Sequence, residues 1–411
     1  MLPLSMSPLK TAPPYNKNSR YYDLNDIIQI AEKEFNDREH CLLINLGIIV
    51  HQYERWVNKL PNVVPYYAIK SNPDIQIINI LNNLGCHFDS ASKKELQKVI
   101  ECGVTSDKII YANPCKPESH IKYSCDNGVN MMVIDSLSEM EKIHRICPNV
   151  KIIIRIKVDD SHSLCKFNIK FGLDVDELID IFDYAHKLNI LIYGVSFHVG
   201  SSCKNKNVFR TAIYECKYVI DLGRLYGFDM NIVDIGGGFP GDIDSNLFDE
   251  FADTINTSIT EYFGKEEYNN IRFIAEPGRY FVMASHTLFS TVINKKVKVK
   301  QTENGLIEKT HIYYILDGIY GVFSGMMFDY AEIDIKVLHK NEKKYDDNEE
   351  QLYNTIIFGP TCDSLDIICK NKKMPEIDIG DKIVVPNIGA YSVASAVEVN
   401  GFPIPEKKYI L

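Results

Sequence analysis

A lysine directly follows an apolar stretch near the start of the chain. Residues 63–69 are almost all aliphatic or aromatic, Lys70 comes next, and Ser71-Asn72-Pro73 then turns the chain. An ammonium at the mouth of a buried strand is costly unless it reaches water or takes part in chemistry. Such a lysine can form a Schiff base with a carbonyl cofactor. Because most lysines are simply exposed, the rest of the chain must decide between the two interpretations.

Other strand-like runs also end in residues that can do chemistry. The run ends carry Asp89, His198 with Ser201, the glycines Gly236, Gly237 and Gly238, and Glu276 with Gly278 and Arg279, while Arg155 interrupts a further apolar run. Taken singly, a core histidine, a glycine turn or a surface arginine would be ordinary. Their recurrence at the same end of strand after strand predicts one active site.

The types of these residues indicate a particular cofactor. Gly236–Gly238 and Gly278 leave bare backbone amides where a phosphate could lie close, and the Arg279 guanidinium can bind that phosphate. Lys70 could bind an aldehyde, and Glu276 could keep a pyridine nitrogen protonated. Together these features predict a site for pyridoxal 5′-phosphate.

A second reactive stretch lies far down the chain. Cys362 and Asp363 follow a Gly-Pro turn, which is a poor place for a packed thiol. A thiol in such a loop can donate a proton, and Asp363 or Asp329 could bind a cation. Tyr391 could add a phenol to the phosphate site.

The spacing of apolar runs predicts the elements that position these residues. Strand-like runs alternate with stretches of helical periodicity and occupy residues 63–70, 86–90, 108–113, 130–135, 151–158, 191–199, 231–236 and 271–276. Alternation of strands and helices predicts parallel βαβ units. Eight of them favour an α/β fold with a closed (β/α)8 TIM-like barrel, whose active site lies at the carboxyl ends of the strands.

Beyond Tyr280 the pattern changes to strands joined by short turns. Strands are predicted at 287–300, 311–316, 331–338, 351–358, 382–386 and 397–403, with a solvated loop from residue 339 to 351. Before the barrel, the pattern predicts a loose stretch to about residue 20, a helix at 23–36, a strand at 41–50 and a helix at 52–60 that packs Trp56 inward. The expected organisation is an N-terminal segment (1–43) that joins the β-domain, a cofactor-binding barrel (44–283) and a mostly antiparallel C-terminal β-domain (284–411).

Composition excludes several classes of protein. The 411 residues are 45% hydrophobic and 24% charged, with a net charge of −10, which argues against a nucleic-acid partner. No apolar run is long enough to span a membrane. The eleven cysteines contain no CxxC pair, which favours reduced thiols in the cytoplasm over a disulfide framework or a metal site.

Several motifs resemble those of the fold-type III pyridoxal-phosphate decarboxylases, most closely the eukaryotic-type ornithine decarboxylases. The matching segments are PYYAIKSNP, FDSASKKEL, IIYANPCK, GVSFHVGSSC, DIGGGFPG, AEPGRYFV, GPTCDSLD and GAYSVASA followed by NGF. They extend from about residue 40 to 405. Departures from the family pattern are Phe328, where tyrosine is usual, and Ser202 and Ser364, where glycine is common.

The resemblance implies a role for each candidate residue. Lys70 would form the Schiff base, Glu276 would pair with the pyridine nitrogen and His198 would stack on the ring, while the phosphate would be held by Ser201, Gly236–Gly238, Gly278, Arg279 and Tyr391, with Asp89 and Arg155 supporting the cofactor face. Cys362 would protonate the carbanion left after carbon dioxide departs. Substrate contacts would come from Asp329, Asp363, Phe328, Tyr320 and Phe402.

The resemblance also implies an assembly and a reaction. Family members complete their sites across a head-to-tail homodimer, with Cys362 and Asp363 coming from the partner chain. The expected reaction converts L-ornithine to putrescine and carbon dioxide, and an antizyme-like regulator is a possible partner. Alternatives are a lysine or arginine decarboxylase, a catalytically silent antizyme-inhibitor-like binding protein and, more remotely, a diaminopimelate decarboxylase or alanine racemase.

Overall fold

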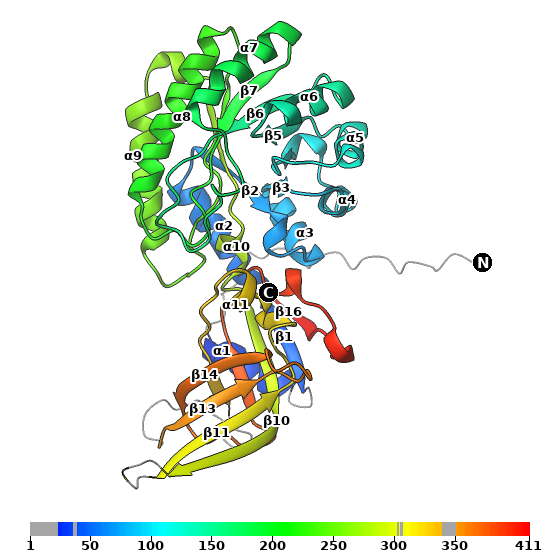
Figure 1. The fold of residues 1–411 in the computed structure, drawn as a ribbon, viewed down its shortest axis with the longest axis vertical. Helices are drawn as coiled ribbons and strands as arrows, with labels where there is room; N and C mark the ends of the chain where they lie inside the picture. Colours follow the sequence, from blue (N-terminus) through cyan, green and yellow to red (C-terminus); the bar gives the residue numbers. More distant parts are fainter. Residues whose placement is uncertain (1–23, 36–38, 302–303, 305–306, 339–350) are drawn as a thin grey trace, which may run out of the picture.

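The chain folds into a barrel with a second, β-rich body beside it (Figure 1). The computed structural model describes residues 24–35, 39–301, 304, 307–338 and 351–411. The loose stretch predicted before residue 20 lies outside the described residues, as does nearly all of the loop predicted at 339–351.

The barrel consists of eight parallel strands that close on themselves, as predicted. In order these are β2 (Val63–Ala68), β3 (His87–Ser90), β4 (Ile109–Tyr111), β5 (Met131–Ile134), β6 (Lys151–Arg155), β7 (Ile192–Ser196), β8 (Ile232–Asp234) and β9 (Arg272–Ala275). Closure comes from β2 pairing with β9, in the register Val63 to Phe273. All carboxyl ends therefore meet at one mouth.

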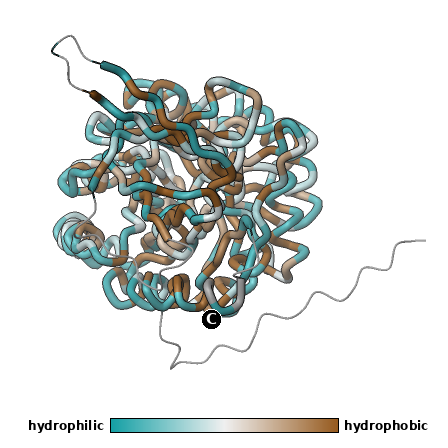
Figure 2. The backbone as a smooth tube through the Cα atoms, turned by 90° about the horizontal axis from the view of Figure 1, so that it is seen from below, coloured by the Kyte–Doolittle hydropathy of each residue, from teal (hydrophilic) through white to brown (hydrophobic). Residues whose placement is uncertain are grey.

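Helices surround these strands and shield them from solvent. They are α2 (Leu46–Lys59), α3 (Ile75–Leu84), α4 (Lys93–Glu101), α5 (Glu118–Asp126), α6 (Leu137–Ile146), α7 (Leu178–Leu188), α8 (Asn207–Leu225) and α9 (Leu247–Phe263). The predicted inward packing of Trp56 is confirmed, because this side chain is fully buried. In Figure 2, hydrophilic segments lie along much of the outer rim and hydrophobic ones are more frequent toward the centre. None of the helices in the described part of the chain is both long and apolar enough to cross a membrane.

The second body is a mostly antiparallel sheet, again as predicted. Its path runs β12-β15-β10-β11-β13-β14, built from β10 (His286–Gln301), β11 (Ile307–Ile315), β12 (Lys336–Leu338), β13 (Tyr353–Phe358), β14 (Ile367–Met374) and β15 (Lys382–Val385). The N-terminal α1 (Leu24–Phe35) and β1 (His40–Asn45) lie with this sheet, since β1 pairs with β10 and with the last strand, β16 (Glu406–Ile410). The short helices α10 (Arg279–Val282) and α11 (Gly325–Phe328) lie near the junction with the barrel.

Some element predictions are wrong. The strand predicted at 41–50 ends at Asn45, because the Asn45 side chain caps α2 by accepting a hydrogen bond from the Gly47 amide at 3.1 Å. The strand predicted at 397–403 is instead a tight turn in which Asn400 has a positive φ of 54°. The strand predicted at 331–338 forms only from Lys336 onward. Strands β14 and β16 were not predicted, because their charged residues hide the strand pattern.

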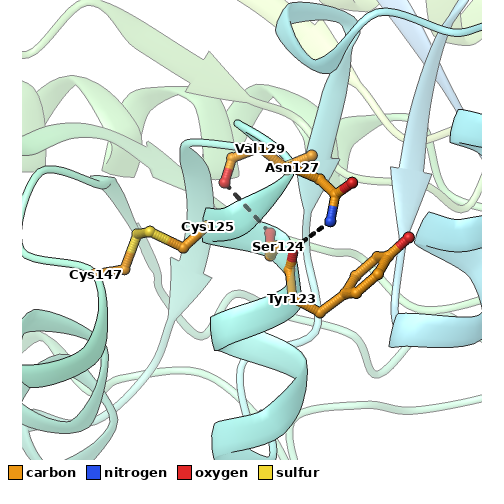
Figure 3. The surroundings of a disulfide bond; sticks show 6 residues. All are labelled: Tyr123, Ser124, Cys125, Asn127, Val129 and Cys147. Carbon is orange, nitrogen blue, oxygen red and sulfur yellow. Dashed lines mark hydrogen bonds between the residues drawn. A yellow bond between two sulfur atoms is a disulfide. The ribbon is translucent and has the colours of Figure 1, made fainter.

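The prediction that all cysteines are free thiols is also wrong. A disulfide joins Cys125 near the end of α5 to Cys147 at the end of α6, and their Cα atoms are 6.0 Å apart (Figure 3). The two residues are 22 positions apart, so that consecutive βα units bring them together. The other nine cysteines are free. Spacing along the chain cannot reveal this pairing, because it depends on how adjacent barrel helices pack.

The C-terminal strand is fastened to the loop that follows Lys70. Lys407 Nζ lies 2.6 Å and the Tyr409 hydroxyl 2.9 Å from Asp74 Oδ2, and Asp74 also caps α3. Burial raises the pKa of Asp74, but the Lys407 charge and the hydrogen bonds outweigh burial and lower it below its ordinary value. A lowered carboxyl pKa stabilises the folded state above the unfolded pKa, and that stabilisation is lost as the pH falls through the folded pKa.

We therefore expect Lys407→Met to lower the free energy of unfolding by about 2 kcal/mol at neutral pH. The difference from wild type should shrink below about pH 4, where Asp74 becomes protonated. Urea unfolding at several pH values measures both effects. Lys408→Met is the matched control, because Lys408 lies on the same strand and pairs with Glu406 at the surface. An equal loss at all pH values would show that Lys407 acts through packing alone.

Candidate active site

Lys70 lies at the barrel mouth, in a tight turn that directly follows β2. Its Nζ atom lies 2.7 Å from Oδ2 of Asp89, which stands on the neighbouring strand β3 with no exposed surface. The lysine side chain keeps 39% of its surface open. Burial opposes the ammonium charge, but Asp89 and Glu276 outweigh burial and raise the pKa of Lys70. Lys70 is therefore protonated in this state, and its ammonium is fixed in position by the ion pair with Asp89.

A cavity of about 340 Å³ opens over Lys70. Most of the predicted site residues line it, namely Lys70, His198, Ser201, Gly237, Gly238, Glu276, Gly278, Arg279, Phe328, Asp329 and Tyr391. They come from four barrel strand ends, from the end of α11 and from the loop that carries Tyr391. Asp89 supports the cavity from behind through its bond to Lys70.

Three carboxyl groups gather beneath the cavity. Burial and the neighbouring charges of Asp234 and Asp89 raise the pKa of Glu276 well above its ordinary value. Burial likewise raises the pKa of Asp234 to about 7. Such a cluster gains stability from an added positive charge, as a protonated pyridine nitrogen would provide. No role is predicted for Asp234 from the sequence, although its position two residues before the glycine triplet is visible there.

His198 is a neutral imidazole of known tautomer. Its Nδ1 accepts a hydrogen bond from the Gly200 amide at 3.0 Å, so the ring proton lies on Nε2. Burial, with Arg155 and Lys70 nearby, lowers the pKa of His198 well below its ordinary value. The Phe167 ring meets it edge-on, with ring centroids 4.9 Å apart. An uncharged flat ring held this way suits contact with a flat cofactor.

Arg279 lines the cavity together with Ser201 and Tyr391. Arg279 Nη2 lies 3.2 Å from Ser201 Oγ, and its guanidinium lies 5.3 Å from the centre of the Tyr391 ring. Arg279 also forms an ion pair with Asp329. A Cβ on Gly238 would lie 2.6 Å from a backbone oxygen, and one on Gly278 would lie 2.9 Å from the Ser71 side chain. Packing therefore requires glycine at both positions, and the Arg279 cation with the Ser201 and Tyr391 hydroxyls supplies groups suited to a phosphate.

These features fit pyridoxal phosphate. Buried polar atoms around the site have no hydrogen-bond partner in the described structure, among them Asp89 Oδ1, Arg155 Nη2, Asp234 Oδ2 and Arg279 Nε. Unpaired buried groups of both charges are costly unless a ligand completes them. Gly236 does not line the cavity, and its φ of +64° and a would-be Cβ contact of 2.1 Å with Phe197 O show that it shapes the turn.

Besides Asp89, Arg155 and Gly236, four more predicted residues lie outside the lining of this cavity within the single chain. Cys362 is exposed, and its amide donates to Asn400 Oδ1 at 3.0 Å. The Asp363 carboxylate accepts a hydrogen bond from the Tyr320 hydroxyl. Tyr320 and Phe402 line a separate small pocket. The four therefore form a second cluster, which one chain does not bring to Lys70.

Sequence reasoning missed the loop that covers the barrel mouth. Cys165 and Phe167, from the long connection after β6, line the cavity, and the Cys165 amide donates to Ser201 O at 3.3 Å. No local pattern distinguishes this connection from an ordinary loop. Ser202, where the family often has glycine, has a positive φ of 55°, which explains that preference.

Comparison with known proteins identifies the family. Residues 46–283 match the family model described as the pyridoxal-binding domain of pyridoxal-dependent decarboxylases. The chain belongs to this family of pyridoxal-dependent decarboxylases, and pyridoxal phosphate is its cofactor.

Three individual proteins show which members of the family the chain resembles. The chain is 40% identical over 382 residues to ornithine decarboxylase of Mus musculus, covering 92% of this chain and 81% of the relative. It is 38% identical to antizyme inhibitor 2 of Xenopus laevis, covering 92% and 83%. Among solved structures, the arginine decarboxylase of Paramecium bursaria Chlorella virus superposes with a TM-score of 0.86 at 30% identity, covering 94% of this chain and all of that chain.

Proposed function

We propose that this protein decarboxylates L-ornithine to putrescine and carbon dioxide. The observation that carries the proposal is Asp329, a buried carboxylate that lines the same cavity as Lys70. A diamino acid that reacts at one end needs an anionic partner for the ammonium at its other end. Similarity to mouse ornithine decarboxylase supports the same substrate.

The cavity residues would divide the work of holding cofactor and substrate. Bound pyridoxal phosphate supplies an electron sink for the bond between Cα and the carboxylate. Lys70 would bind its aldehyde, Glu276 would hold a proton at the pyridine nitrogen, and neutral His198 would hold the ring. The phosphate would lie against Arg279, Ser201, Gly237, Gly238, Gly278 and Tyr391, while Asp89 and Arg155 would support the cofactor. Arg279 would then exchange its ion pair with Asp329 for the phosphate, leaving Asp329 to the substrate.

The second cluster would complete the site from a partner subunit. Cys362 would donate a proton to the substrate carbon, and Asp363, with Tyr320 and Phe402 beside it, would contact the substrate. Large apolar side chains are exposed near both clusters, with exposed fractions of 73% for Phe328 and 67% for Leu365. Exposed apolar groups of this size are typical of protein interfaces. We propose a homodimer in which each cavity receives Cys362 from the other chain.

The decisive experiment compares carbon dioxide release from L-ornithine, L-lysine and L-arginine with added pyridoxal phosphate. We expect kcat/KM for ornithine to exceed the others by at least about a hundredfold, the discrimination typical of one additional methylene. Preference for lysine or arginine would assign the substrate differently while keeping the chemistry. No release from any of them with cofactor bound would favour a catalytically silent binding protein. A cytoplasmic location and an antizyme-like regulator stay predictions.

A further inference from the structure

Three distant segments meet behind the cofactor cavity. They are the turn that carries Lys70, the segment from Pro277 to the start of β10, and the loop that carries Tyr391. The Ala68 amide donates to Pro277 O at 3.1 Å, and the Tyr391 amide donates to Ser71 O at 2.8 Å. The relative positions of Lys70, Arg279 and Tyr391 therefore depend on how these segments are joined.

The Asn72 side chain lies where the three segments meet. It is 1% exposed, and its Nδ2 atom lies 3.0 Å from Gly389 O and 3.0 Å from His286 Nε2. A side-chain amide has two N–H donors, one for each acceptor. Its Oδ1 accepts from the Asp74 amide at 3.2 Å, so every polar atom of Asn72 is used. The Asn72 side chain therefore binds His286, which lies 214 positions further along the chain, and Gly389, which lies 317 positions further along.

His286 extends this hydrogen-bond network from Asn72 to Ser285 and Val282. Because Nε2 accepts from Asn72, the ring proton lies on Nδ1, which faces Ser285 Oγ at 2.8 Å. Ser285 Oγ in turn donates to Val282 O at 2.9 Å. Burial lowers the pKa of the fully buried His286 to about 4, which keeps the ring neutral and able to accept. All polar groups in this chain of hydrogen bonds are paired.

The Tyr391 loop packs directly against this network. A Cβ on Gly389 would lie 1.8 Å from Val282 O and 2.5 Å from His286 Nδ1, so no side chain fits there. Two residues later, Tyr391 has a positive φ of 54°, a conformation that a tyrosine adopts only when its surroundings impose it. Two hydrogen bonds supply that restraint. Gly389 O accepts one from the Asn72 side chain, and the Tyr391 amide donates the other to Ser71 O.

We infer that Asn72 and His286 are positioning residues, which lock the Tyr391 loop against the Lys70 turn and so set the affinity for pyridoxal phosphate. Neither residue lines the cavity. The inference goes beyond the proposed substrate, because cofactor affinity does not depend on which amino acid is decarboxylated.

The test measures the dissociation constant for pyridoxal phosphate by absorbance titration of the full chain. Asn72→Ala leaves Gly389 O without its hydrogen-bond donor, and His286→Leu leaves one N–H of the Asn72 side chain without its acceptor. We expect each variant to raise the dissociation constant about tenfold. His286→Gln keeps a side-chain acceptor, and its dissociation constant should equal that of wild type within experimental error. Thermal unfolding of the cofactor-free proteins, measured in parallel, reports any purely structural loss.

Unchanged cofactor affinity in Asn72→Ala and His286→Leu, with lowered melting temperatures, would overturn the inference and leave these residues a packing role only. If neither variant folds, the cofactor affinity of Ser285→Ala tests the inference instead. It removes the partner of His286 Nδ1, and we expect it to weaken cofactor binding about threefold. Wild-type affinity in Ser285→Ala would then overturn the inference. Failure to turn over ornithine bears on the proposed function alone, since the titration contains no substrate.

Discussion

Lys70→Ala is expected to lower kcat for decarboxylation at least about a thousandfold, through loss of the covalent attachment and of the amine that moves protons at the site. The substitution also leaves the buried Asp89 without the ammonium that lies 2.7 Å from it. Carbon dioxide release measures the loss. The absorbance of the protein-bound cofactor should at the same time lose the band that arises from its bond to lysine.

The exposed Lys94 provides the control for this prediction. Lys94→Ala removes a lysine outside the cavity and should leave both release and absorbance unchanged. Activity of Lys70→Ala within tenfold of wild type would contradict the role proposed for Lys70, and another amine would have to be sought.

Cys362→Ala is expected to lower kcat about a hundredfold, the usual contribution of a positioned proton donor. Cofactor binding should be unchanged, because the proposed role of Cys362 is to donate a proton to the substrate carbon, and none of the proposed cofactor contacts involves this thiol. Cys115→Ala is the matched control, since Cys115 is likewise an exposed free thiol. Wild-type turnover by Cys362→Ala would remove this thiol from the reaction.

Mixing the two inactive variants tests whether sites are shared between subunits. If each cavity takes Lys70 from one chain and Cys362 from the other, half of the randomly mixed dimers are hybrids with one intact site of two. Activity should then recover to about a quarter of wild type. A mixture that exchanges subunits and stays inactive would show that each site belongs to one chain.

The barrel and most of the cavity lining were predictable from local patterns. Parallel strands place all their carboxyl ends at one mouth, so residues that end different strands must gather there. Lys70, His198 and Glu276 follow this rule, because each stands at the end of a strand recognisable from its apolar run. Strands β14 and β16 were not predicted, because their place in the sheet depends on neighbouring strands rather than on their own hydrophobicity.

The chemistry available at the barrel mouth was therefore predictable from the residues, because strand period and residue type are local properties. The surroundings of that chemistry depend on how distant segments pack. The Arg279–Asp329 pair, the loop with Cys165 over the cavity and the network from Asn72 to Gly389 each join segments more than 35 residues apart. The Cys125–Cys147 bond likewise depends on the packing of adjacent helices. Such contacts arise from how whole elements pack, and no local pattern of residues encodes them.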